Sequence, residues 1–276
     1  MSSRSLSLPR ISGWNVLRNL AAIALGAFTL LPLLYGFAVS IRPRSEVFGT
    51  PHLIPREPTI DPYIQVFDSI ARNLIFSLFT AVGVSILVLG IAIPGAYAFA
   101  RLEFPGRKKL FYMIVLIMLL PIVGLIIPIL TLWHELGLYN SITGLWLGIV
   151  PGQIPVALWI FRDYFQKLPS NLEEAAMVYG TTQFEAFVRV VLPLAAPAMI
   201  AVGFLGFLWG WNAFLFPNLL TTSGGPRPAI VNLFNALSAD STQPWPFIMA
   251  MTFTIGLPPA VMYMASRRYL ENALSF

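Results

Sequence analysis

The sequence contains no cysteine and very little charge. Without cysteine, neither a disulfide framework nor a thiolate metal site can form. Only 11% of the 276 residues are charged, whereas a soluble domain carries about 25%. The hydrophobic fraction is 57% and the mean hydropathy +0.75, which indicates a membrane protein. The net charge of +5 does not indicate nucleic-acid binding, because the basic residues are scattered between apolar runs and do not gather on one face.

Ionisable residues are also missing from six long stretches, at 19–41, 73–100, 110–133, 136–161, 190–226 and 241–266. Each is long enough for the roughly 20 apolar residues that cross the hydrocarbon core of a bilayer. The last two include flanking loop, so we predict their spans at 194–217 and 246–266. The first run is too long for the core of a cleaved signal peptide, which favours an uncleaved span. The sequence therefore predicts an all-α membrane protein with six transmembrane helices in one domain over residues 1–276.

The distribution of Lys and Arg predicts the orientation, because loops inside the cell are enriched in them. We place both termini in the cytoplasm. Five basic residues then lie outside or at the outer edge, and the other twelve of the 17 lie inside; the outer five are Arg42, Arg44, Arg56, Arg72 and Arg227. The opposite orientation would put the twelve outside. We therefore predict a multi-pass protein of the cell membrane whose segment 167–193, between spans four and five, is cytoplasmic.

Residues 167–193 are polar and acidic, and they contain two helix-start signals. Ser-Asn-Leu-Glu at 170–173 and Thr-Gln-Phe-Glu at 182–185 both match a capping box, in which a hydroxyl begins the helix and a carboxylate three residues later reaches back. Gly180 lies where a helix would end in a left-handed cap, and Pro193 suits the first turn of the next span. The segment is therefore predicted to form a helix-turn-helix.

Both predicted helices carry an apolar stripe at helical spacing. The stripes consist of Leu172, Ala175, Ala176 and Tyr179, and of Phe184, Phe187, Val188 and Val191. One stripe can pack on the ends of the chain's own spans, while Glu173, Glu174 and Glu185 would stay in the cytoplasm. An ordinary solvated loop with good caps is one interpretation. We prefer a docking surface, because a loop between spans needs no paired helices.

The same segment resembles the cytoplasmic EAA loop of ABC importer permeases. That pattern is Glu-Ala-Ala, three residues, Gly, nine residues, an aliphatic residue, any residue and Leu-Pro. The matching positions here are Glu174, Ala175, Ala176, Gly180, Val190, Leu192 and Pro193. Tyr179 and Thr181 depart from the pattern, because the family commonly has Asp and often has Ala at these two places.

The resemblance extends over nearly the whole chain. AYAFARLEFPGRKKLFYMIVLIMLLP at 96–121 is similar to the junction of spans two and three in carbohydrate permeases of the maltose-transporter type. WGWNAFLFP at 209–217 resembles a signature in their fifth span. With six spans and a short N-terminal tail, the chain is similar to the smaller, six-span partner of the two permeases.

In that family the loop is the coupling helix, which seats in a groove of a separate ATPase subunit. The resemblance implies ATPase docking through Glu173, Glu174, Ala175, Ala176, Gly180 and Phe184. Alanine allows close approach, and Glu174 can form a charge-assisted hydrogen bond with a basic partner. The resemblance also implies a second permease subunit, an ATPase dimer, an external solute-binding protein and a sugar substrate, with ATP and Mg²⁺ on the partner and no cofactor on this chain.

No catalytic or nucleotide-binding motif occurs in the sequence. It lacks the G-x-x-x-x-G-K-[ST] phosphate loop, and His134-Glu135 lacks the second histidine of a zinc-protease motif. We therefore predict neither an enzyme nor a metal site. The best rival is a self-sufficient secondary transporter. Such proteins usually couple through ionisable residues inside their spans, and the predicted spans hold none.

Asn212 is the most suggestive buried polar group in the predicted spans, and it lies beside Trp211 in the fifth. An indole and an amide can stack on a sugar ring and hydrogen-bond to it, so both are candidates for a substrate path. The alternative is an interhelical hydrogen bond between permease subunits. The resemblance favours the alternative, because in the best-known member of the family most sugar contacts come from the other permease.

Overall fold

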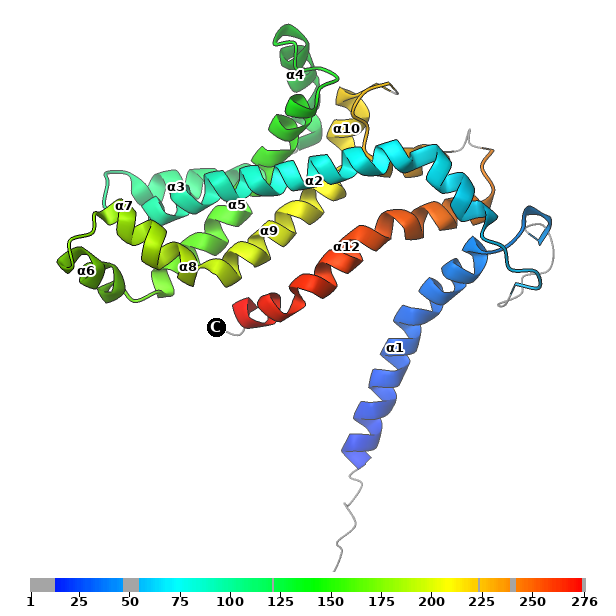
Figure 1. Cartoon of the computed structure of the whole chain (residues 1–276), viewed down its shortest axis with the longest axis horizontal. Coiled ribbons are helices and arrows are strands. Elements are labelled where there is room, and N and C mark those ends of the chain that lie inside the picture. The colour runs from blue at the N-terminus through cyan, green and yellow to red at the C-terminus, as the bar shows by residue number, and fades with distance from the viewer. Residues whose placement is uncertain (1–12, 47–54, 121, 223, 239–241, 275–276) are drawn as a thin grey trace, which may run out of the picture. The chain divides into compact units, whose positions relative to one another are not determined.

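The computed structural model describes residues 13–46, 55–120, 122–222, 224–238 and 242–274, and these residues form helices without strands (Figure 1). The long helices are α1 (Gly13–Ser40), α2 (Asp61–Arg101), α5 (Ile142–Lys167), α9 (Ala196–Trp211) and α12 (Trp245–Leu274). The shorter helices are α3 (Arg107–Leu116), α4 (Ile122–Glu135), α6 (Asn171–Val178), α7 (Gln183–Ala186), α8 (Leu192–Leu194), α10 (Leu215–Leu220) and α11 (Ala229–Ala236). Two 3₁₀ turns, η1 (Arg44–Glu46) and η2 (Ile117–Leu119), and one π turn, η3 (Phe187–Val191), complete the elements. The predicted all-α class is confirmed.

Four helices, α1, α2, α5 and α12, are long and apolar enough to cross a membrane. Two bent pairs pass the same test when each pair is taken together. One consists of residues 107–119 and 124–135, and the other of residues 183–194 and α9. The chain therefore has up to six spans. The 41 residues of α2 rise about 60 Å, roughly twice the hydrocarbon thickness, so α2 extends beyond the membrane.

Two of the predicted spans are interrupted. The third, at 110–133, is not a single helix, because Leu120 has an extended ψ of 130°. A residue that precedes proline avoids the α conformation, and Pro121 follows. The fifth, at 194–217, is also shorter than predicted, since α9 ends at Trp211.

The other spans differ from the prediction at their ends. The fourth, predicted at 136–161, begins at Ile142, because the Oγ atom of Ser141 caps the helix by accepting a hydrogen bond from the Gly144 N–H at 3.0 Å. α1 and α2 begin before the predicted starts, and α12 continues beyond the predicted end. Charged residues continue these helices, so charge-free runs underestimate helix length.

Two compact units make up the described chain. They lie within Met1–Val66 with Thr242–Phe253, and within Phe67–Ser241 with Thr254–Phe276. In the first unit, the hydroxyls of Ser40 and Tyr63 lie 2.7 Å apart, and the ring of Phe37 meets that of Phe253 edge-on at 5.6 Å. The most apolar window of α1 buries none of its residues in the chain. The single domain expected over residues 1–276 stays a prediction.

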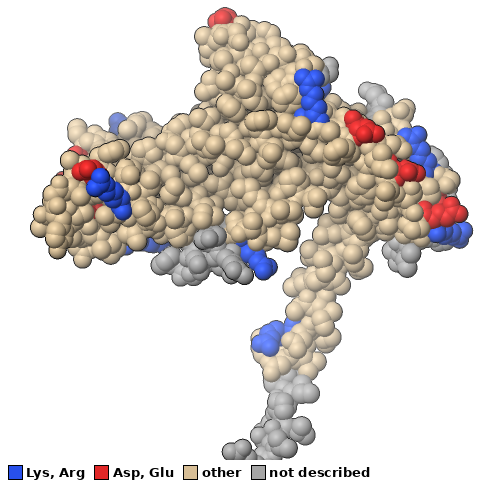
Figure 2. All heavy atoms as spheres, viewed as in Figure 1, with Lys and Arg blue, Asp and Glu red and all other residues tan. Residues whose placement is uncertain are grey.

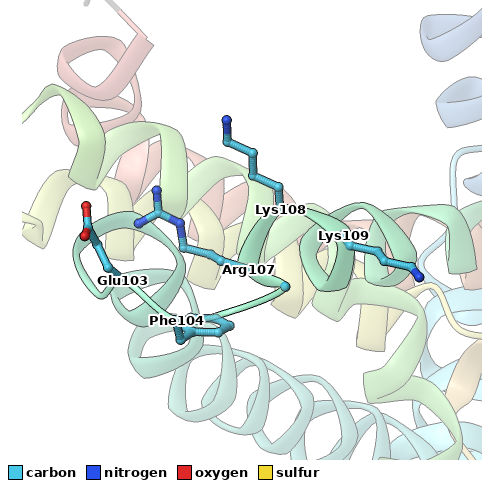
Figure 3. Close-up of a pocket in the computed structure, with 6 residues that line it drawn as sticks. Glu103, Phe104, Arg107, Lys108 and Lys109 are labelled. Atoms are coloured by element: carbon cyan, nitrogen blue, oxygen red, sulfur yellow. The ribbon is translucent and has the colours of Figure 1, made fainter.

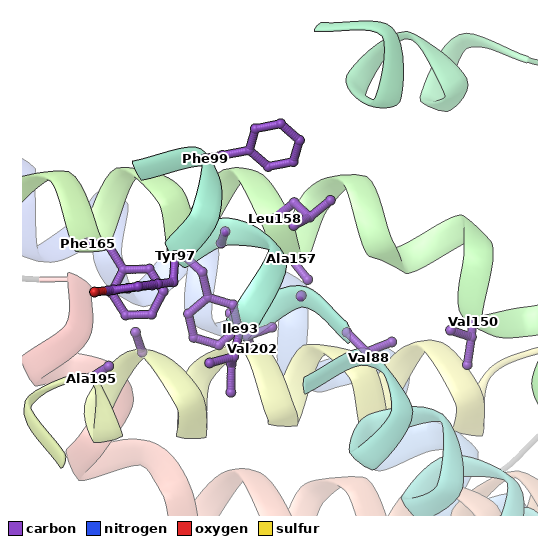
Figure 4. Packing of buried hydrophobic residues seen from close by; sticks show 14 of the residues in the cluster. Val88, Ile93, Tyr97, Phe99, Val150, Ala157, Leu158, Phe165, Ala195 and Val202 are labelled. Atoms are coloured by element: carbon purple, nitrogen blue, oxygen red, sulfur yellow. The ribbon is translucent and has the colours of Figure 1, made fainter. Parts of the chain in front are cut away.

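The second unit has its core where α2, α5 and α9 pack together. Figure 4 shows Val88 of α2, Leu158 of α5 and Val202 of α9 in this buried cluster. α2 and α9 approach each other closely, because a Cβ atom added at Gly210 would lie only 2.8 Å from the Cα atom of Ala81. Small residues allow such close backbone approach between membrane helices, and they hold α9 firmly against α2.

Apolar side chains dominate the surface. Phe28, Leu119 and Ile127 are each at least three-quarters exposed, and Figure 2 shows wide expanses without a charged side chain. A soluble monomer rarely exposes so much contiguous apolar area. Such a surface is typical of a chain that lies in a membrane or binds other proteins.

Candidate functional site

Residues 171–194 form two helical arms at one end of the second unit, beside the ends of α2 and α5 (Figure 1). The first arm is α6, and the second runs through α7, η3 and α8 without a break. We call the two arms together the elbow. The predicted helix-turn-helix is thus present in the structure.

Gly180 makes the turn between the arms. Its φ of 91° lies in the left-handed region, which an L-residue with a Cβ atom adopts only with strain. The Gly180 N–H donates to the Met177 carbonyl at 3.0 Å, and the Thr181 N–H donates to the Ala176 carbonyl at 3.2 Å. These two bonds form a Schellman motif, so the predicted glycine cap is confirmed.

Only one of the two predicted capping boxes exists. In the second arm, the Thr182 hydroxyl accepts from the Glu185 N–H at 3.2 Å, while the Glu185 carboxylate accepts from the Thr182 N–H at 2.9 Å. The box predicted at 170–173 is wrong. Ser170 has helical backbone angles, unlike a capping residue, and makes no cap hydrogen bond through its side chain.

The Glu173 carboxylate lies inside the chain. The Nε atom of Arg101 lies 2.8 Å from Glu173 Oε1, and the Tyr97 hydroxyl donates to Glu173 Oε2 at 2.8 Å. Arg101 also donates from Nη2 to the Leu168 carbonyl at 2.7 Å. A buried carboxylate is costly unless it is paired and hydrogen-bonded, and here it is both. The expectation that Glu173 stays solvated is therefore wrong.

A sequence signal for this pair existed. Arg101 follows the charge-free run 73–100, and Tyr97 lies one turn before it on the same face. A cation and a hydroxyl at the end of an apolar run indicate a carboxylate partner. Glu173 is an additional acidic residue directly before the Glu-Ala-Ala sequence. The pattern indicates a bond, but nothing local identifies its distant partner.

The outer face of the elbow is exposed and largely apolar. Val178, Tyr179 and Phe184 are 85%, 90% and 73% exposed. Glu174, Ala175 and Gly180 are exposed beside them, and Ala176 is half-buried. The predicted stripe of the first arm therefore does not pack on the spans. Exposed aromatic and aliphatic side chains that cluster beside a carboxylate are typical of a protein-binding surface.

The second predicted stripe packs inward only in part. Phe187 and Val191 are buried, whereas Phe184 and Val188 remain exposed. The π turn η3 rotates the side chains that follow it, so the α-helical spacing used for the prediction does not hold through the arm. The inner residues of this stripe attach the second arm to the core.

The second arm continues into α9 through the π turn and a bend. In η3, the Leu192 N–H donates to the Phe187 carbonyl, five residues back. Pro193 follows, and its ring would clash with a carbonyl in a regular helix, so the wider turn accommodates it. Pro193 lies in the first turn of α8, but the span itself begins at Ala196, after a 75° bend.

Trp211 is buried and fully engaged within the chain. Its indole Nε1 donates to the Ile255 carbonyl of α12 at 3.1 Å, and its ring stacks on Phe207. That carbonyl lacks a helical partner because Pro259, four residues on, has no N–H. Asn212 is exposed and donates to the Leu208 carbonyl at 2.9 Å. The expectation that Asn212 is buried is therefore wrong for this chain. The Trp211 bond lies within one chain and does not test a hydrogen bond between permease subunits, so the path roles of both residues stay predictions.

A shallow hollow of about 450 Å³ lies at the turn between α2 and α3, where the sequence predicted no site (Figure 3). It is lined by Glu103, Phe104, Gly106, Arg107, Lys108 and Lys109. Arg107 donates to the Leu102 carbonyl at 2.8 Å. None of its three cations pairs with a carboxylate in the part of the chain that the structure describes. These cations belong to the basic residues from which the orientation was predicted.

Known proteins resemble this chain in sequence and fold. The family described as "Binding-protein-dependent transport system inner membrane component" matches residues 92–275. The trehalose transport system permease protein SugB of Mycobacterium tuberculosis is 32% identical over 273 residues, which cover 96% of each chain. The trehalose/maltose transport system permease protein MalG of Thermococcus litoralis is 29% identical, over 94% of this chain and 95% of that one. A chain from the crystal structure of a bacterial ABC transporter involved in the import of the acidic polysaccharide alginate matches with a TM-score of 0.82 at 21% identity, over 95% of this chain and 100% of that one.

Proposed function

The chain belongs to the family of binding-protein-dependent transport system inner membrane components, and from this premise we propose that it forms half of the translocation path of an ABC importer for a sugar. A second permease subunit supplies the other half. An external solute-binding protein delivers the sugar, and a separate ATPase dimer supplies the energy. Both termini and the elbow lie in the cytoplasm, where that ATPase is.

The exposed face of the elbow is the observation that carries the proposal. Glu174 and Ala175 are exposed on α6, and Tyr179 and Phe184 extend the surface across the turn at Gly180. This face offers small residues for close approach, aromatic rings for burial and one carboxylate for a cation on the partner. ATP and Mg²⁺ bind on the ATPase, because this sequence has no phosphate loop.

Sugar as the transported solute is supported by the relatives. The proteins from Mycobacterium tuberculosis and Thermococcus litoralis are both named as permeases of trehalose or trehalose/maltose systems, and both align along almost the whole chain. The binding protein and the second permease share in choosing the sugar, so the identity of the sugar is a property of the complete importer.

Reconstitution tests the proposal. The chain is co-expressed with the second permease and the ATPase, placed in liposomes with the binding protein, and supplied with radiolabelled trehalose or maltose. We expect uptake that requires ATP and all four components, and neither uptake nor ATP hydrolysis by the purified chain alone. Uptake by the lone chain that follows an ion gradient would instead identify a secondary transporter.

A further inference from the structure

Three residues join the elbow to the end of α2. Tyr97 and Arg101 lie one turn apart on α2, and Glu173 lies in the first turn of α6. The Tyr97 hydroxyl and the Arg101 guanidinium take one carboxylate oxygen of Glu173 each, both at 2.8 Å. We call these three residues the linkage.

The linkage reaches more than two elements. Arg101 donates to the carbonyl of Leu168, the residue that follows α5. The ring of Tyr97 lies 4.4 Å from that of Phe187 in η3 and meets Phe165 of α5 edge-on at 6.1 Å, as Figure 4 shows for Tyr97 and Phe165. Tyr97 thus holds the first arm through its hydroxyl and the second arm through its ring.

Burial sets this ion pair apart from the others in the described residues. The side chains of Arg101 and Glu173 are only 15% and 9% exposed. Lys167–Asp163 and Arg189–Glu185 are more exposed, and each joins residues four apart in one helical stretch. Exposed ion pairs of that kind contribute little to stability. A pair within one helix also cannot transmit a displacement to another element. The linkage can do so, because it is buried, because each carboxylate oxygen has its own partner, and because it joins separate elements.

We propose that Tyr97, Arg101 and Glu173 transmit the displacement of the docked elbow to α2, and so couple ATP hydrolysis to the opening of the translocation path. The proposal rests on the proposed function, because it needs an ATPase that docks on the elbow. It divides the roles of two neighbouring carboxylates. Glu174 faces the partner and binds it, whereas Glu173 faces inward and is a positioning residue that passes the movement on.

The complete importer in liposomes tests the linkage, with three variants of this chain. Glu173→Gln removes the charge, Tyr97→Phe removes only the hydroxyl, and Glu185→Gln is the control. Glu185 lies in the same elbow and forms an ion pair, but glutamine preserves its capping box. The measurements are ATPase that co-purifies with the permease, ATP hydrolysed, and radiolabelled trehalose or maltose imported, each per mole of folded complex.

We expect Glu173→Gln to retain ATPase binding while sugar imported per ATP falls at least about five-fold, the lower end of couplings measured between distant sites. Tyr97→Phe should change the same ratio in the same direction by less, and Glu185→Gln should match wild type. A double variant with Arg101→Glu and Glu173→Arg exchanges the two charges, and it should recover part of the sugar imported per ATP.

Two outcomes overturn the linkage. If Glu173→Gln and Tyr97→Phe both import as much sugar per ATP as wild type, the contacts transmit nothing. If Glu173→Gln lowers folded complex, hydrolysis and import in proportion, with the ratio unchanged, the role of Glu173 is only structural. A wild-type complex that binds no ATPase refutes the proposed function itself, which separates that failure from the other two.

Discussion

Replacing Gly180 with alanine is the most direct test that the turn of the elbow serves docking. The φ of Gly180 is 91°, and a Cβ atom added there meets nothing within 4 Å. The change therefore creates no clash with neighbouring atoms, and its cost is confined to the backbone. A left-handed L-residue costs about 1–2 kcal/mol. If the ATPase binds only the native turn, its affinity should fall by roughly 5- to 30-fold.

Gly106 supplies a matched control. Its φ is 81°, and a Cβ atom added there also meets nothing within 4 Å, so Gly106→Ala carries the same backbone strain outside the elbow. Purified permease complexes with either substitution are titrated with the ATPase, and the two dissociation constants are compared with wild type. We expect weakened binding for Gly180→Ala alone. Equal affinities for the two variants would refute the role of the turn in docking.

Three further predictions follow from the structure. Glu174→Lys should leave partner-permease association intact but weaken ATPase docking by about 2–5 kcal/mol if the carboxylate becomes a buried pair; co-purification and sugar uptake that match wild type would contradict this. Cysteine at Gln183 should be shielded from impermeant thiol reagents in intact cells and cysteine at Thr222 should be labelled, with no background because the chain has no cysteine; labelling at Gln183 would reverse the orientation. Trp211→Phe should destabilise the complex by about 1–3 kcal/mol, because it leaves the Ile255 carbonyl without a donor; an unchanged thermal unfolding profile would show that another group satisfies that carbonyl.

Local signals in the elbow were predictable because their causes are local. The left-handed turn at Gly180 depends on the absence of one Cβ atom. The capping box depends on atoms of Thr182 and Glu185, which are three residues apart. Glu173 fits an equally good local pattern, yet Arg101 and Tyr97 hold it instead. A buried ion pair can outweigh a solvated cap, which contributes only about 1 kcal/mol, and its partners lie far away in the sequence.

The same limit applies to the spans. Charge-free runs identified the apolar segments, but they carry no information on where a helix bends. The break at Leu120 follows from the proline after it, whereas the widening of η3 and the bend before Ala196 arise where the elbow must join α9. The sequence indicated Asn212 as a buried polar group, but Asn212 is exposed and its neighbour Trp211 is buried. The acceptor of Trp211 depends on Pro259 in another helix.

The paired glutamates of α6 are best understood from helix geometry. Consecutive residues of an α-helix point about 100° apart, so Glu173 and Glu174 cannot both face the partner once the face of one is fixed. Arg101 fixes Glu173 inward, and Glu174, which is exposed, must then face outward. The inner bond therefore sets the rotation at which α6 presents its outer face. If a partner binds Glu174, it acts on a helix whose rotation is already fixed relative to α2. Docking can then move a span and not only the loop.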